Sequence, residues 1–160
     1  LAESLAIAAD DTAGSLHDKL ANLGAQMIVN TLDRLPLSAK PQPDLGACYA
    51  AKIEKSEAAL DWRLSAAQLE KQIRAFNPFP GAVSDLDGRA IKIWQAKCIA
   101  ASGTPGQVVA VDGSGIVVAC GKGGLRLSEL QKAGGKRLPV AQFLAGNPIT
   151  AGSSFTLPTE

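Results

Sequence analysis

The sequence has few of the residues from which catalytic and metal sites are built. Its 160 residues include one histidine and three cysteines, and aromatic residues make up 4%. Cys48, Cys98 and Cys120 are widely spaced and form no Cys-x-x-Cys pair, which argues against a disulfide framework and a zinc site. We expect them to be reduced, packed thiols. His17 has no second ligand or triad partner at helical spacing, so we expect no catalytic role for it.

Long apolar segments and catalytic motifs are also absent. No apolar run approaches the roughly 18 residues of a membrane helix, and the chain does not open with a basic-then-apolar signal segment. We therefore expect a cytoplasmic protein without a membrane partner. The sequence has no ordered Ser/His/Asp set, no GxGxxG after a strand and no GxxxxGK(S/T) loop. GKGG at residues 121–124 lies between two strand patterns, so we interpret it as a hairpin turn.

The overall composition is typical of a globular, soluble protein. Hydrophobic residues make up 46% and charged residues 19%, with a net charge of +1. The part from residue 83 onward carries more cations than acids, which is a weak indication of nucleic acid. The chain begins LAESLAIAADDTAG, without methionine and within an alternating apolar pattern, and we expect an upstream part to be missing.

The first part of the chain is predicted to be helical. Apolar residues recur at helical spacing on both sides of Gly24, in the sets Leu16, Leu20, Leu23 and Ile28, Leu32, Leu35. The pattern predicts two amphipathic helices, or one helix broken at the glycine, with Thr12 as the N-cap. Residues 36–46, PLSAKPQPDLG, contain three prolines and predict an extended linker.

A further helix is predicted after this linker. Ser65 and Gln68 form a capping-box pattern, and the apolar residues that follow share one face: Ala66, Leu69, Ile73 and Phe76. The helix must end before the Asn77-Pro78 step, because the residue before a proline avoids the helical region. We expect Phe76 and Phe79 to pin this helix to the domain that follows.

The rest of the chain reads as short strands. Asp87-Gly88, Asp112-Gly113 and Gly123-Gly124 are hairpin-type turns between strand patterns, and residues 140–144 predict a late short helix. We therefore predict an α+β fold, in which an N-terminal helical segment and a linker precede a small, closed, OB-like β-barrel. The predicted parts are residues 1–35, 36–62 and 63–160.

Basic residues are the strongest candidates for binding. Lys132, Lys136 and Arg137 cluster in the Gly-rich loop QKAGGKR, where flexible cations suit phosphates, although charge alone favours an ordinary solvated surface. Arg74 is also explained by pairing with Glu70 at i, i+4. For one large aromatic residue of the strand region, core packing is favoured over base stacking: Trp94.

Five long stretches follow one another in the order of a known family. They are DDTAGSLHDKLANLGAQMIVNTL, YAAKIEKSEAALDW, SAAQLEKQIRAFNPFPGA, GRAIKIWQA and LRLSELQKAGGKRLPVAQFLAG. The last four resemble the linker and C-terminal domain of methionyl-tRNA formyltransferases, and the first resembles the last helical part of that family's N-terminal domain. The resemblance covers nearly the whole chain.

The resemblance implies transfer of a formyl group from 10-formyltetrahydrofolate to the methionine of initiator tRNA, in translation initiation. The family's catalytic Asn, His and Asp lie in the missing N-terminal catalytic domain and match no residue here, so we expect this chain alone to be inactive and to bind no cofactor. The linker and OB-like domain are expected to contact tRNA mainly through its phosphate backbone. The candidates for that contact are Lys52 in YAAKI and Lys132, Lys136 and Arg137 in QKAGGKR.

The sequence departs from the family in three places. Ala51 stands where many relatives have proline, Phe79 where tryptophan is usual, and no Lys or Arg follows Leu144. An alternative stays open, namely the structural C-terminal domain of another folate-dependent formyltransferase, without nucleic-acid binding. The sequence also leaves open whether residues 1–35 fold or self-associate without the rest of the enzyme.

Overall fold

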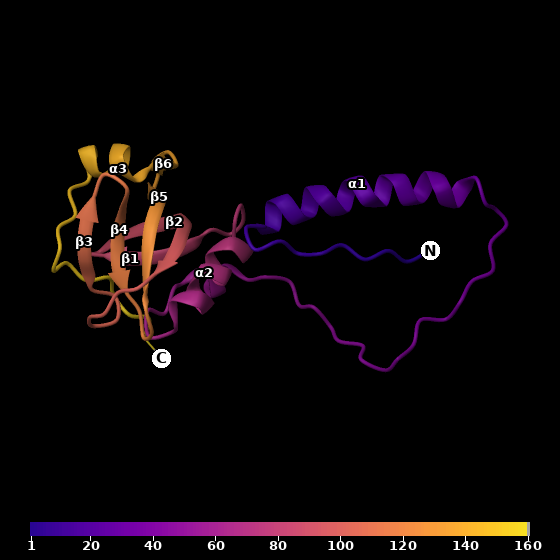
Figure 1. Cartoon of the computed structure of the whole chain (residues 1–160), viewed down its shortest axis with the longest axis horizontal. Coiled ribbons are helices and arrows are strands. Elements are labelled where there is room, and N and C mark those ends of the chain that lie inside the picture. Colours follow the sequence, from indigo (N-terminus) through magenta and orange to yellow (C-terminus); the bar gives the residue numbers. More distant parts are fainter. Residues whose placement is uncertain (160) are drawn as a thin grey trace.

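The first regular element is a long helix that projects from the rest of the molecule (Figure 1). The computed structural model describes residues 1–159, and in it α1 runs without a break over Ala13–Leu32. The predicted N-cap is confirmed, because the Thr12 hydroxyl accepts a hydrogen bond from the Ser15 N–H at 3.1 Å. The predicted break at Gly24 is wrong, since an interior glycine costs a helix only about 1 kcal/mol and does not stop it.

The segment after α1 is extended and exposed. It forms a wide loop that leads from the far end of α1 back to the domain (Figure 1), and it contains no helix or strand before the 3₁₀-helix η1 over Lys55–Ala58. Several prolines prevent it from continuing α1. No residue of α1 is buried, so its apolar residues Ile28, Val29 and Leu32 are exposed.

Helix α2, over Ala66–Ala75, forms as its sequence pattern predicts. The Ser65 hydroxyl and the Gln68 side chain cap its first turn reciprocally. Its buried face carries Leu69 and Ile73, and Phe76 at its end is also buried. The expected role of the second phenylalanine is wrong, because Phe79 is 58% exposed and only Phe76 joins the core.

Six strands make one sheet in which every paired strand is antiparallel. The order is β1-β2-β5-β4-β3, with β6 paired to the end of β5. The three predicted hairpin turns are confirmed, and the GKGG segment connects β4 to β5. The strands and the final helix are β1 Ala82–Leu86, β2 Arg89–Ile99, β3 Val108–Asp112, β4 Gly115–Ala119, β5 Gly124–Lys132, β6 Leu138–Pro139 and α3 Val140–Gly146.

The α+β class is confirmed, but a closed barrel is not. β1 and β3 are the edges of the sheet and do not pair with each other. The C-terminal segment lies across the gap: the Phe155 N–H donates to the Gly106 carbonyl at 2.9 Å, and the Thr156 N–H donates to the Asp85 carbonyl at 2.8 Å. The C-terminal segment thus bonds backbone carbonyls of β1 and of the loop before β3, at the two open edges of the sheet. In a closed barrel a neighbouring strand would occupy this place.

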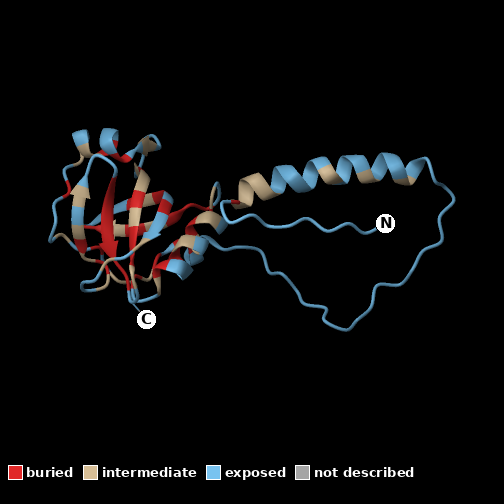
Figure 2. Cartoon of the chain, in the orientation of Figure 1, coloured by how far each residue is buried: buried red, intermediate tan, exposed pale blue. Residues whose placement is uncertain are grey.

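The core is formed by the sheet together with α2, α3 and the C-terminal segment, and the buried residues concentrate in this part of the molecule (Figure 2). Trp62, just before α2, is fully buried; its indole N–H donates to the Ser84 hydroxyl at 2.8 Å, and its ring lies 5.2 Å from that of Phe155. Trp62 therefore joins α2, β1 and the C-terminal segment. Among residues 1–159, no helix combines the length and the apolar character needed to cross a membrane.

Candidate nucleic-acid interface

The turn between β5 and β6 presents two lysines to solvent. The Gly135 N–H donates to the Lys132 carbonyl at 2.9 Å, and the Gln131 side chain donates to the Gly135 carbonyl at 2.8 Å, so the backbone of the turn is held in place. Lys132 and Lys136 are both exposed. Within residues 1–159 neither ammonium group has a hydrogen-bond or ion-pair partner, so both can meet an anion without breaking an internal contact.

The third cation of this loop is held by the protein itself. The Arg137 guanidinium forms an ion pair of 2.5 Å with Glu129, donates a hydrogen bond of 3.3 Å to the Asn77 side chain, and lies 5.0 Å from the centre of the Trp94 ring. Three partners on three elements fix its position. Arg137 can therefore anchor the loop to the end of α2, whatever it binds outside.

Trp94 is packed rather than presented, as predicted. It is 8% exposed, its indole N–H donates to the Gln131 side chain at 2.9 Å, and the Lys92 ammonium lies 5.4 Å from its ring centre. The β2–β5 pairing shifts register between Ile93 and Ala96, so Trp94 lies at a bulge. The bulge lets two consecutive side chains, Ile93 and Trp94, be buried together, which a regular strand does not allow.

The fourth candidate is in a different part of the chain. Lys52 lies in the extended segment before η1, its side chain is exposed, and it forms no hydrogen bond or ion pair within residues 1–159. In the described part of the chain, no hydrogen bond or ion pair joins it to the β5–β6 turn. The structure thus brings Lys132, Lys136 and Arg137 together and leaves Lys52 separate.

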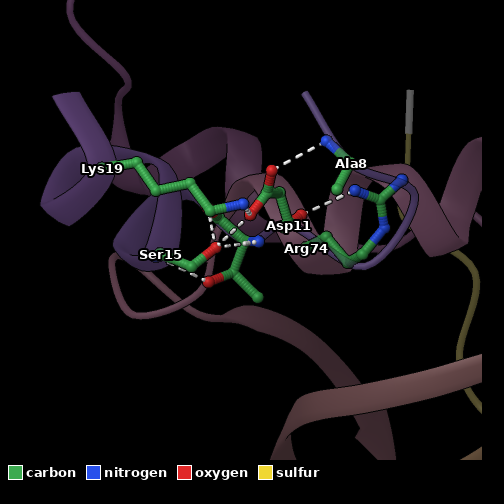
Figure 3. Close-up of polar contacts among 6 residues, drawn as sticks. Ala8, Asp11, Ser15, Lys19 and Arg74 are labelled. Carbon is green, nitrogen blue, oxygen red and sulfur yellow. Dashed lines mark hydrogen bonds and ion pairs between the residues drawn. The ribbon is translucent and has the colours of Figure 1, made fainter. Parts of the chain in front are cut away.

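A polar cluster joins the start of α1 to α2 (Figure 3). Arg74 forms the expected ion pair with Glu70 at 2.7 Å, and its guanidinium also donates to the Asp11 carbonyl at 2.6 Å. The Asp11 carboxylate accepts hydrogen bonds from Lys19 at 2.6 Å, from the Ala8 N–H at 2.8 Å and from the Ser15 hydroxyl at 2.8 Å. These donors, Lys19 first, lower the pKa of Asp11 to about 2.

The same junction connects to the basic turn through one residue. The Asn77 carbonyl accepts from the Gly14 N–H at 3.0 Å, and its side chain donates to the Trp94 carbonyl at 3.0 Å and accepts from Arg137. Asn77 therefore touches α1, β2 and the β5–β6 turn. The sequence showed that a helix stops here, but no sequence signal indicated these contacts between distant segments.

The thiols differ from the sequence-based expectation. Cys120 is buried, and burial raises its pKa to about 11, but Cys48 and Cys98 are exposed. The prediction of packed thiols is therefore correct for Cys120 and wrong for Cys48 and Cys98. His17 is exposed and lies 3.3 Å from Asp18, and within residues 1–159 no three His, Cys, Asp or Glu side chains gather where a metal ion could bind.

The chain matches curated proteins over nearly its whole length. It is 56% identical over 152 residues to the methionyl-tRNA formyltransferase of Dechloromonas aromatica, covering 95% of this chain and 50% of that protein. The methionyl-tRNA formyltransferase of Burkholderia vietnamiensis is 55% identical over 160 residues, covering 96% of this chain and 49% of that protein. The chain therefore spans about half the length of these relatives.

Solved structures share the fold at low sequence identity. A multiply substituted variant of HypX from Aquifex aeolicus superposes with a TM-score of 0.63 at 19% identity, over 76% of this chain and 22% of that one. HypX in complex with tetrahydrofolic acid gives 0.60 at 19% identity, over 81% of this chain and 25% of that one. Residues 52–148 match the family model described as "Formyl transferase, C-terminal domain". This match covers more than half of the chain, which therefore belongs to the family of formyl transferase C-terminal domains.

Proposed function

We propose that this chain is the tRNA-holding portion of an enzyme that transfers a formyl group from 10-formyltetrahydrofolate to methionine on initiator tRNA. In this proposal residues 1–35 are the helical end of the catalytic domain, residues 36–62 are the linker, and residues 63–160 are an OB-like domain. The missing catalytic domain supplies the folate site and the reacting groups. The similarity to methionyl-tRNA formyltransferases over 95% of the chain supports this assignment.

The observation that carries the proposal is the pair of unengaged ammonium groups on the β5–β6 turn, Lys132 and Lys136. Lysines that contact phosphates supply affinity and position without reading bases. Their backbone is held by the hydrogen bonds around Gly135, so less freedom is lost when RNA binds. Arg137 supports the turn in this proposal and contributes to RNA contact less than the two lysines do, because Glu129 neutralises it.

A titration of fluorescent initiator tRNA and an elongator tRNA at two salt concentrations tests the proposal. Binding should be similar for the two tRNAs and should fall steeply with salt, because phosphate contacts release counterions. The slope of log affinity against log salt is negative, and replacing both Lys132 and Lys136 with alanine should make it less steep by about 2, or about 1 per lysine. Lys71→Ala, an exposed lysine on α2, is the matched control.

The linker lysine is tested in the same way. Lys52→Ala should make the salt dependence less steep by about 1 in the slope of log affinity against log salt. Lys40→Ala, at another exposed lysine of the same segment, should leave the slope unchanged. If no tRNA binds even at low salt, the domain is a scaffold, and the alternative of a structural C-terminal domain holds. Formyl transfer by this chain alone would contradict the assignment of catalysis to the missing domain.

A further inference from the structure

A cavity of about 460 Å³ opens beside the basic turn. It lies where β2 begins, β5 ends and α3 leads into the C-terminal segment, and its volume is in the range of small-ligand sites. The residues that line it include Arg89, Ala90, Lys132, Phe143, Asn147 and Ile149. Lys132 thus belongs both to the cavity wall and to the proposed phosphate contact.

The cavity combines an apolar interior with a cationic rim. Phe143 and Ile149 are buried, at 1% and 8% exposed, whereas Arg89 and Lys132 are exposed. Two acids lie near this rim: Asp87 is 3.7 Å from Arg89, and the Asp85 carboxylate accepts a hydrogen bond from the Gly88 N–H at 2.8 Å. The acids lie on the Arg89 side of the rim, whereas Lys132 forms no ion pair within residues 1–159, so its ammonium group remains available to an anion that carries an apolar group.

One polar side chain in the wall retains hydrogen-bonding capacity. The Asn147 amide donates one N–H to the Phe143 carbonyl at 3.0 Å. Its second N–H and its carbonyl oxygen have no partner within residues 1–159, and a side-chain amide offers two donors and one acceptor in total. A donor and an acceptor side by side on an apolar wall match the edge of a nucleobase.

We propose that this cavity takes one unpaired nucleobase of the bound RNA, with the phosphate of that nucleotide between Lys132 and Arg89. This inference rests on the proposed function, because the same Lys132 holds the backbone in both. Bases within a duplex are stacked and cannot enter a cavity, so the site selects single-stranded nucleotides. Trp94, whose indole bonds the Gln131 side chain beside the basic turn, cannot supply a stacking platform instead, because it is 8% exposed and Lys92 and Arg137 lie over its ring.

The test compares a single-stranded oligouridylate with an abasic ribose–phosphate oligomer of the same length, each titrated against the full chain at low salt. The two probes have the same phosphates and differ only in the bases. The unsubstituted chain should bind the oligouridylate about tenfold more tightly, since burying a base against a protein surface is worth that much. Both probes should lose affinity in parallel as salt rises.

Filling the cavity should remove this difference. Ala90 at the start of β2 and Ala133 after β5 are exposed residues of the cavity lining, so Ala90→Phe and Ala133→Phe each add a ring at the cavity, and failure of one variant to fold leaves the other. Each should weaken oligouridylate binding about tenfold and leave the abasic oligomer unchanged. The matched control is Ala110→Phe, an exposed alanine on β3 away from the cavity, which should change neither.

The outcomes separate the two proposals. Equal affinity of the unsubstituted chain for both probes, or equal weakening of both by Ala90→Phe and Ala133→Phe, overturns the base site and leaves the phosphate contacts standing. If neither probe nor tRNA binds, the base site and the proposed function both fail. The base site is supported if the unsubstituted chain and Ala110→Phe prefer the oligouridylate while Ala90→Phe and Ala133→Phe lose this preference.

Discussion

Gly81 is a position at which a single added methyl group should disturb the packing that supports the candidate interface. Its φ of +82° lies in the left-handed region, and its N–H closes the end of α2 by donating to the Phe76 carbonyl at 2.8 Å. A Cβ atom added there would lie 2.7 Å from the Trp94 ring and 3.2 Å from the Lys92 side chain. Gly81→Ala therefore combines backbone strain with a steric conflict.

A second glycine separates these two effects. Gly88 has a φ of +75° in the β1–β2 turn, but nothing lies within 4 Å of a Cβ added there. Gly88→Ala should therefore cost only the strain, about 1 kcal/mol after the gain from a stiffer unfolded chain. Gly81→Ala should cost about 2 kcal/mol more, because Trp94 must move within a packed environment.

Urea unfolding followed by tryptophan fluorescence measures the difference. At a typical slope of about 2 kcal/mol per molar urea, the midpoint of Gly81→Ala should lie about 1 M below that of Gly88→Ala. Displacement of Trp94 should also release Arg137 from the ring and weaken the hold on the basic turn. Equal midpoints for the two variants would refute the reasoning, since the contact with Trp94 would then carry no cost.

Three further predictions concern the junction, the thiols and the core. The folded-state pKa of Asp11 is lowered from 3.8 to about 2, so the stability that its carboxylate gives to the start of α1 is present above about pH 4 and is lost as pH falls through 2. Amide exchange at Ala8, whose N–H donates to this carboxylate, should quicken in that window, and Asp11→Asn should abolish this pH dependence. A thiol reagent at pH 8 should modify exposed Cys48 rapidly and buried Cys120, whose pKa is about 11, only on unfolding; equal rates would contradict the burial. Trp62→Phe should lower the free energy of unfolding by about 2 kcal/mol, measured in urea, because it leaves a buried hydroxyl without its donor.

Much of the fold follows from signals that lie close together in the sequence. The Ser65–Gln68 capping box, the apolar face of α2 and the Asp87-Gly88 turn act through residues a few positions apart, so each can be read without knowing what lies across the molecule. Among the predictions that failed, those for Gly24 and Phe79 depended on contacts of the folded chain that no local pattern reveals. Gly24 does not break α1, because no competing contact draws the chain away, and Phe79 stays exposed, because the turn after Asn77 directs it to solvent.

Some features of the candidate interface follow from the sequence, and others follow only from the tertiary structure. The sequence by itself determined the cationic loop QKAGGKR and the family to which it belongs, since both depend on which residues follow one another. Only the tertiary structure decided that Arg137 is engaged by Glu129 and Asn77, and that a cavity opens beside Lys132. It also decided that the C-terminal segment, not a further strand, spans the open sheet. These features depend on which distant residues meet, and that is set by packing of the whole chain rather than by local preference.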